Sequence, residues 1–304
     1  MKRVKAWAVR CVVIACMAAL AVCMVACTQE TYTPEEGTPT ISSPTIGEDG
    51  VLRVGVDSSS TPLAGQSTTS DNIVGIDVDI AAALADELGL KLEIVDVGDD
   101  PATALSEGTV DIVLGVSASN TSETYWLSDI YVSTAVALFT LEGSSTDIPA
   151  NDSSVSIAAQ VSSKSAWAVA NQYDQSVIST TSNLEDAFTA LADGEVSYVA
   201  SDAIIGTFAA YNTDLDVQIV ALMEEASGYC VAVLNTNTDL QSAISEALAT
   251  ISDNGTISII EKKWLGTELD LSALAVTDTS STTESESTDE STTETTETTE
   301  TTAA

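Results

Sequence analysis

Residues 75–89 read Gly-Ile-Asp-Val-Asp-Ile-Ala-Ala-Ala-Leu-Ala-Asp-Glu-Leu-Gly. Large apolar side chains recur at Ile80, Leu84 and Leu88, the spacing that places them on one face of a helix. Gly89 follows, and glycine commonly ends helices because it adopts left-handed backbone angles without steric cost. The stretch therefore predicts a helix over residues 77–88 that packs one apolar face against a neighbouring layer.

Short β-rich runs alternate with helical patterns on both sides of this stretch, which indicates an α/β fold with mainly parallel sheets. We expect strands at residues 51–56, 91–95, 110–114, 155–158, 196–200 and 217–221. Further helices are expected at residues 101–107, 163–172, 183–192 and 239–255, and around Trp264.

The pattern forms two similar sets, which predicts two lobes joined by a hinge. Lobe 1 is expected to span residues 50–140 plus 232–272, and lobe 2 residues 141–231. Two crossovers, near Ala137–Leu141 and Tyr229–Leu234, would form the hinge. Polar loops at the strand ends would then line a cleft between the lobes.

The charge of the chain excludes several classes of function. It has 9 basic and 46 acidic residues, and it is more acidic still beyond Cys27 because four of the basic residues lie in the first ten positions. Such a surface repels nucleic acid.

The absence of histidine excludes Ser–His–Asp triads and imidazole metal sites, and we expect neither cofactor nor metal. Cys230 is the one cysteine after Cys27, which predicts a free, buried thiol.

The N-terminus has the layout of a secretory signal peptide. A basic start precedes an apolar run over residues 11–26, and small Ala26 stands immediately before Cys27, which resembles a bacterial lipobox. We expect a signal peptide at residues 1–26 and a lipid on Cys27 that anchors the protein at the extracellular face of the cell membrane. The alternative is an uncleaved helical anchor.

Low-complexity segments flank the two predicted lobes. Residues 27–49 predict a flexible tether, and the acidic Thr/Ser/Glu tail at residues 273–304 predicts disorder because it lacks apolar side chains.

Several segments together resemble the bacterial family 3 extracellular solute-binding proteins, the polar amino-acid type. They are Gly75–Ile80 with the helix after it, Val51–Asp57, Gly108–Ile112 and Glu261–Gly266. The resemblance implies the two-lobed periplasmic-binding-protein-like fold of type II. It also implies capture of a small polar solute, an amino acid or related amine or acid, by hinge closure and its delivery to the membrane subunits of an ABC importer.

The resemblance also implies roles for individual residues. Asp202, at the end of a predicted strand, matches the carboxylate that holds a ligand ammonium, and capping of the next helix is the alternative. Asp57 matches a second polar contact or else a turn, and Ser117 and Ser119 match a ligand-binding loop or else a simple strand end. Asp77 and Asp79 begin a helix, and we expect them to cap it.

Departures from the family pattern bear on the ligand. Thr124 stands where the family has an arginine for the ligand carboxylate, and Ser60 and Leu63 occupy positions that usually carry rings. Ser163 and Lys164, at a predicted helix start, offer a substitute anion site, although a lysine there is also consistent with simple solvation. Alternatively, an acidic cleft with Asp57, Glu123 and Asp202 suits a cationic amine.

Three functions remain open from the sequence. A transport-coupled binding protein without enzymatic activity is expected. A surface lipoprotein with a decayed site, acting as an adhesin or sensor part, is the second. An enzyme resembling the cyclohexadienyl dehydratases is the third, and the missing histidine and arginine weigh against it.

Overall fold

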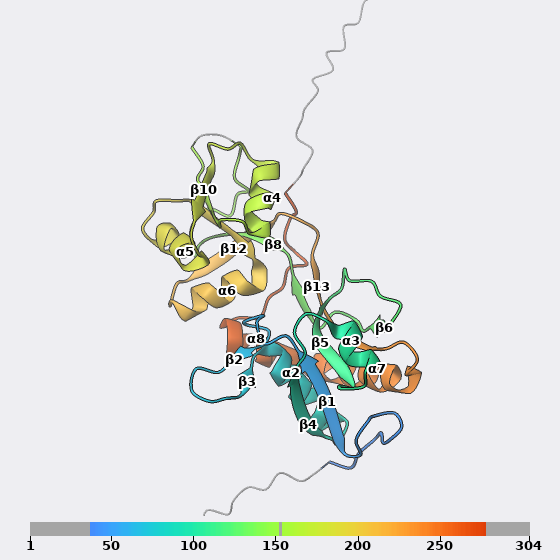
Figure 1. The fold of residues 1–304 in the computed structure, drawn as a ribbon. Coiled ribbons are helices and arrows are strands. Elements are labelled where there is room, and N and C mark those ends of the chain that lie inside the picture. Colours follow the sequence, from blue (N-terminus) through green and yellow to red (C-terminus); the bar gives the residue numbers. More distant parts are fainter. Residues whose placement is uncertain (1–36, 152–153, 278–304) are drawn as a thin grey trace, which may run out of the picture. The chain divides into compact units, whose positions relative to one another are not determined.

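The computed structural model describes residues 37–151 and 154–277, which build two sheets with helices packed against them (Figure 1). The signal peptide, Cys27 and most of the acidic tail lie outside the described residues. The first sheet has the order β4-β1-β5-β13-β6, and β7 also pairs with β13. Its strands are β1 (Val51–Val56), β4 (Lys91–Asp96), β5 (Ile112–Ser117), β6 (Tyr125–Leu127), β7 (Val132–Thr134) and β13 (Ser227–Leu234).

The second sheet has the order β10-β9-β11-β8-β12. Its strands are β8 (Val136–Leu141), β9 (Ile157–Gln160), β10 (Ile178–Thr181), β11 (Tyr198–Asp202) and β12 (Val217–Leu222). A separate two-stranded ribbon joins β2 (Gly65–Gln66) to β3 (Ile73–Val74). Within each main sheet some pairs are parallel, whereas β13 and β8 pair with their neighbours antiparallel. The predicted two-lobed α/β fold is therefore confirmed.

Seven helices are described, and each predicted helix is among them. They are α2 (Ile76–Glu87), α3 (Pro101–Ser106), α4 (Lys164–Gln172), α5 (Leu184–Ala192), α6 (Ala203–Asn212), α7 (Thr238–Asp253) and α8 (Thr256–Leu265). In α2 the predicted stripe of Ile80, Leu84 and Leu88 is buried in one cluster with the first sheet. The 3.6-residue period thus identified the face that builds the core.

The predicted caps of α2 are wrong. The helix begins after Gly75, and no side chain caps it. Gly75 has φ 153°, and a Cβ there would lie 2.1 Å from the carbonyl oxygen of Leu63, so this helix start requires glycine. The carboxylates of Asp77 and Asp79 instead reach other elements: the Tyr131 hydroxyl donates to Asp77, and the Trp264 indole N–H donates to Asp79.

The chain changes sheet earlier than the sequence suggested. We expected crossings near Ala137–Leu141 and Tyr229–Leu234, but β8 pairs wholly inside the second sheet and β13 wholly inside the first. The crossings therefore lie at residues 134–136 and 223–227. Both strands are mostly apolar, and such runs do not reveal which sheet they join.

Both flanking segments are shorter than predicted. In the predicted tether, Ile46 is 1% exposed and packs into the cluster of the first sheet. The amide of Gly47 donates to Asp111, and the side chain of Asn237 donates to the carbonyl of Thr45. At the other end, residues 273–277 of the predicted tail pack on the second sheet, where Val276 forms a bridge with Leu222.

Helix α6 is buried on two sides. Ile204 and Phe208 pack into the cluster of the first sheet, whereas Ala203 and Ala210 pack into a cluster of the second. Gly206 lies against the ring of Phe139, and a Cβ at this glycine would lie 2.6 Å from two ring carbons. The helix therefore tolerates no side chain at this point.

Gly206→Ala should destabilise the protein by about 1–3 kcal/mol, because the added methyl overfills the space beside Phe139. Thermal unfolding checks this. Gly206→Ala combined with Phe139→Leu should lose less than the sum of the two single changes, since the smaller side chain makes room for the methyl. Additive losses would show that the clash is not the cause.

Candidate functional site

Asp202 lies where β11 ends and α6 begins, and its carboxylate is already partly engaged. One oxygen, Oδ1, accepts hydrogen bonds from the amides of Ile204 and Ile205, at 2.9 and 3.1 Å. The other, Oδ2, accepts one from the Thr134 hydroxyl at 2.7 Å. Asp202 therefore caps α6, as one of the two predicted roles requires. A carboxylate oxygen accepts about two hydrogen bonds, so Oδ2 retains room for one more donor.

Burial raises the pKa of Asp202, and the nearby Lys164 ammonium acts in the opposite direction. Tyr229, on β13, lies near the same group. Its pKa is raised to about 12, first by burial and then by the carboxylates of Asp202 and Asp77. Among the described residues its hydroxyl has no hydrogen-bond partner. A half-buried carboxylate and a phenol with an unpaired hydroxyl thus lie close together where the chain crosses between the sheets.

Lys164 begins α4, as predicted, but it is not a free cation. Its Nζ lies 2.6 Å from a carboxylate oxygen of Glu224, an oxygen that also accepts a hydrogen bond from the amide of Val136. Ser163 accepts a hydrogen bond from the amide of Ala166 and so caps α4. A ligand carboxylate at this helix start would have to compete with Glu224 for the lysine.

The residues after β1 that were predicted to contact the ligand are engaged within the protein instead. Ser59 and Ser60 donate hydroxyl hydrogen bonds of 2.7 Å to the two carboxylate oxygens of Asp57. These bonds lower the pKa of Asp57, with Ser59 contributing most. The turn thus satisfies the polar groups of Asp57 and Ser60 locally. Leu63 is 5% exposed and belongs to the core cluster of the first sheet, so it is a packing residue.

The predicted loop residues lie at opposite ends of β13. Ser117 pairs with Tyr229 in the sheet register, and its hydroxyl lies 2.8 Å from that of the exposed Ser119. Thr124 precedes β6, and its carbonyl accepts from the amide of Asn235, which follows the far end of β13. Tyr229 and Asn235 are six residues, or about 20 Å, apart along the strand direction. The structure therefore brings Ser117 towards Tyr229 and leaves Thr124 and Glu123 away from it.

Thr134, Glu224 and Tyr229 belong to this candidate site, and the sequence did not reveal them. No local pattern marks them, because each lies in or beside a crossing segment, and only the structure showed where these crossings are. Together with Ser117, Lys164 and Asp202 they form the candidate site. It combines two carboxylates, one ammonium, hydroxyl groups and one aromatic ring.

A second buried carboxylate lies behind the site. Asp77 is 1% exposed and accepts from the Tyr131 hydroxyl at 2.7 Å, and that hydroxyl accepts from the amide of Gly115 at 2.7 Å. Burial raises the pKa of Asp77 to about 7, although the Tyr131 hydrogen bond acts in the opposite direction. This network joins α2 to the strand that ends at Ser117.

The raised pKa of Asp77 predicts a pH-dependent stability. The unfolded carboxyl titrates near pH 4 and the folded one near 7, so the stabilisation is complete below pH 4 and is lost as the pH rises to 7. Asp77→Asn keeps an acceptor for Tyr131 but does not ionise, and it should remove this part of the loss. Above pH 8 the variant should be more stable by at most about 4 kcal/mol.

Unfolding of both chains between pH 4 and 8 measures this difference. Glu261, whose pKa burial also raises to about 7, is unchanged in both chains and so provides a common background. Parallel curves for the wild type and Asp77→Asn would contradict the assignment.

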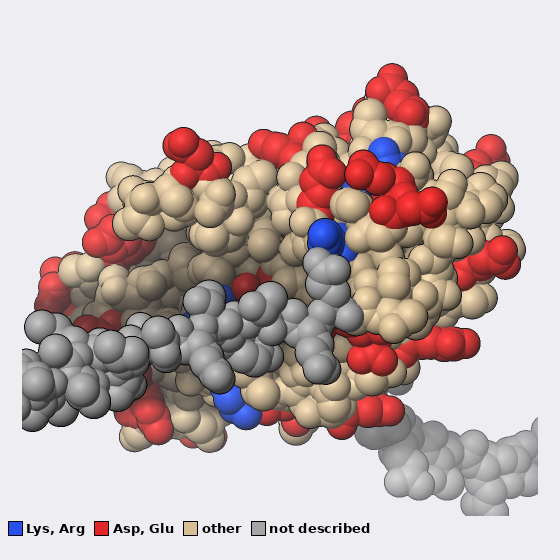
Figure 2. Space-filling model, turned by 90° about the horizontal axis from the view of Figure 1, so that it is seen from below, with Lys and Arg blue, Asp and Glu red and all other residues tan. Residues whose placement is uncertain are grey.

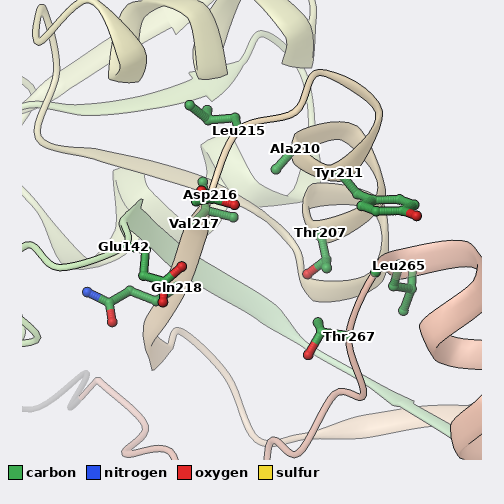
Figure 3. Close-up of a pocket in the computed structure, with 11 residues that line it drawn as sticks. Glu142, Thr207, Ala210, Tyr211, Leu215, Asp216, Val217, Gln218, Leu265 and Thr267 are labelled. Carbon is green, nitrogen blue, oxygen red and sulfur yellow. The ribbon is translucent and has the colours of Figure 1, made fainter.

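A separate pocket of about 440 Å³ lies between α6, β12 and the end of α8 (Figure 3). Its walls include the carboxylates of Glu142 and Asp216 and the ring of Tyr211. None of the predicted ligand residues lines it. We assign no ligand to this pocket.

The surface is strongly acidic, and Figure 2 shows acidic side chains spread over a face with few basic ones. Arg53, the one arginine after residue 10, is bound to Asp111 through a 2.7 Å ion pair. It therefore offers no guanidinium to a ligand.

Among the described residues, no group of three or more acidic or cysteine side chains forms a metal site. No described helix is long and apolar enough to cross a membrane. The predicted buried, free thiol at Cys230 is confirmed.

Comparison with known proteins gives consistent matches. The family model described as bacterial extracellular solute-binding proteins, family 3, matches residues 52–267. A curated relative, the L-cystine-binding protein TcyA of Bacillus subtilis (strain 168), is 22% identical over 230 residues. The match covers 72% of this chain and 83% of the relative.

Solved structures agree in fold. An ancestral cationic amino acid solute-binding protein (AncCDT-1) is 27% identical with a TM-score of 0.59, covering 71% of this chain and 96% of that one. A polar amino acid ABC uptake transporter substrate-binding protein from Streptococcus thermophilus is 19% identical with a TM-score of 0.64, covering 72% and 87%. The L-cystine solute receptor of Neisseria gonorrhoeae, in its unliganded open conformation, is 19% identical with a TM-score of 0.59, covering 72% and 94%.

Proposed function

Because this chain belongs to the bacterial extracellular solute-binding proteins of family 3, and so has a solute-binding role, we propose that it captures a small polar solute with an ammonium group, an amino acid or related amine. The observation that carries the proposal is the carboxylate of Asp202. It is half-buried at the crossing between the sheets, and its Oδ2 retains room for one donor beside the Thr134 hydroxyl. A charge-assisted hydrogen bond from an ammonium fits that vacancy.

The charges around Asp202 support a ligand with a positive group. Arg53 is held by Asp111, and Lys164 is held by Glu224. A solute with a single carboxylate and no amine would therefore meet two carboxylates and would have to compete with Glu224 for Lys164. The ring of Tyr229 adds a face on which an ammonium is favourable. The similarity to the ancestral cationic amino acid solute-binding protein also favours a ligand with a positive group.

We propose that the two lobes close on the ligand when it binds. The chain crosses from one lobe to the other at residues 134–136 and 223–227. The ligand would first meet lobe 1 near Ser117 and Tyr229, and Asp202 would complete its contacts from lobe 2. Contacts that exist only in the closed state favour that state, and importer membrane subunits would then recognise it.

Export and anchoring complete the proposal. Residues 1–26 would act as a signal peptide and a lipid on Cys27 would hold the protein at the extracellular face of the cell membrane, where an ABC importer receives the solute. Labelling cells with a radioactive fatty acid tests the anchor, since Cys27→Ser should abolish incorporation into this protein.

A thermal-shift screen of L-cystine, L-arginine, L-glutamine, putrescine and citrate tests the solute class. We expect at least one amine-bearing compound to raise the unfolding temperature and citrate to have no effect. A shift by citrate alone would contradict the proposal. No shift with any compound would favour the decayed-site alternative, and formation of product from prephenate or arogenate would favour the enzyme.

A further inference from the structure

The segment after α8 links the hydrophobic clusters of the two sheets. Leu269 packs against the cluster of the first sheet, and Leu271 is 4% exposed within a cluster of the second. Only Asp270 stands between them. Figure 1 shows this red end of the described chain running from α8 to the elements of the second sheet.

Leu269 is held on the first side by α8. Glu261 of that helix accepts a hydrogen bond from the backbone of Leu269, and Lys262 forms a 3.0 Å ion pair with Glu268. Leu265, at the end of α8, is buried in the same cluster as the first sheet. The first anchor of the segment is therefore part of lobe 1.

Residues 271–277 are held on the second side by backbone and side-chain contacts. The amide of Leu222 donates to the carbonyl of Ala275 at 2.9 Å, and the amide of Thr277 donates to the carbonyl of Leu222 at 2.7 Å. The Thr277 side chain, 5% exposed, donates to the side chain of Gln172. The second anchor thus extends β12 and reaches α4, both in lobe 2.

We propose that residues 270–277, which we call the strap, form a third connection between the lobes and limit how far they open. The family match ends at residue 267, so the strap lies beyond the part that this chain shares with the family model. Two residues of extended chain span at most about 7 Å, which fixes the greatest distance between the Leu269 and Leu271 backbones while both ends stay docked.

The limit acts even when other contacts between the lobes break. Helix α6 also touches α8, and the ring of Tyr211 lies against Gly266. These side-chain contacts can separate during opening, whereas the strap is covalently joined to α8 and stays docked on lobe 2 through its backbone hydrogen bonds to Leu222 and the burial of Leu271. By restricting the open states, it also reduces the freedom that is lost when the lobes close on a ligand.

The decisive experiment lengthens the strap without undocking it. Gly-Ser-Gly-Ser is inserted between Leu269 and Asp270 of the full chain, which adds up to about 14 Å of reach. The matched control carries the same insertion after Thr277, beyond the second anchor. Small-angle scattering without ligand should give a larger radius of gyration for the first chain than for the control, while hydrogen exchange at the Leu222 amide stays slow in both.

A second pair of variants tests the docking itself. Leu271→Asp places a charge in the cluster and should accelerate exchange at Leu222 and enlarge the radius of gyration. Ala273→Asp adds the same charge at an exposed position of the strap and should do neither. Slow exchange at the Ile157 amide of β9 would show that lobe 2 remains folded.

Identical scattering from the lengthened chain and its control would overturn the proposal, as would unchanged exchange at Leu222 in Leu271→Asp. Both readouts are made without a solute. A negative result in the screen of solutes therefore leaves this test intact, and failure of the strap leaves the proposed solute binding intact.

Discussion

Asp202→Asn should weaken binding of the amine-bearing solute found in the screen by about 10- to 100-fold while leaving the unfolding temperature nearly unchanged. The loss corresponds to one charge-assisted hydrogen bond of about 1.5–3 kcal/mol. The fold is spared because asparagine caps helices as well as aspartate does. Its side-chain oxygen can accept from Ile204 and Ile205, as Asp202 does now. Titration calorimetry and thermal unfolding give the two quantities.

Two further variants separate capping from binding. Asp202→Ala should lose binding and also about 0.5–2 kcal/mol of stability, since the cap is removed. Asn183 caps α5 by accepting a hydrogen bond from the amide of Asp186 at 2.7 Å. Asn183→Ala removes this cap and should therefore cost about as much stability as Asp202→Ala, but it should leave the affinity for the solute unchanged. Full affinity in Asp202→Asn would refute the role of Asp202 in binding and reduce it to a cap.

Binding should also depend on pH through the same residue. An ammonium ligand requires the ionised carboxylate, and burial raises the pKa of Asp202. Affinity in the wild type should therefore fall as the solution becomes acidic through that raised pKa, earlier than for an ordinary aspartate.

Arg53→Ala should cost about 3–5 kcal/mol of stability, because it leaves the Asp111 carboxylate buried without its partner. The guanidinium contacts both oxygens of Asp111, at 2.7 and 3.2 Å, and also donates to the carbonyl of Gly108. The side chain of Asp111 is only 5% exposed. The amides of Gly47 and Arg53 still donate to this carboxylate, but they carry no positive charge.

The matched control is Lys262→Ala. Lys262 pairs with Glu268 at 3.0 Å, but the two side chains are 56% and 51% exposed, so the loss should be at most about 1 kcal/mol. Denaturant unfolding of both variants gives the comparison. Equal losses would show that burial of Asp111 is not what makes the Arg53 pair important.

The sequence predicted the elements of this fold well, because the signals that form them are local. The periodic stripe of α2 and the cap at Asn183 gave helices where the structure has them. The order of strands and helices gave the two-lobed α/β class. Asp202 was also placed correctly, at the end of a strand and the start of a helix, since its cap needs only the next three residues.

The tertiary structure alone decided how these elements meet. Strands β8 and β13 are mostly apolar, so only pairing showed where the chain crosses between the sheets. The partners of charged groups also came from distant parts of the chain: Lys164 pairs with Glu224, and Asp77 with Tyr131. For the same reason the family pattern assigns Leu63 a role in binding, although its side chain is buried in the core.

The sequence by itself thus determined six of the helices, six of the strands, the family and the capping end of β11, because hydrophobic period and backbone capping act over a few residues. What Asp202 faces, which cations are free and how residues 270–277 join the lobes were decided by packing between segments that lie up to 184 positions apart. Burial and ion pairing depend on such neighbours, and a linear pattern does not contain them.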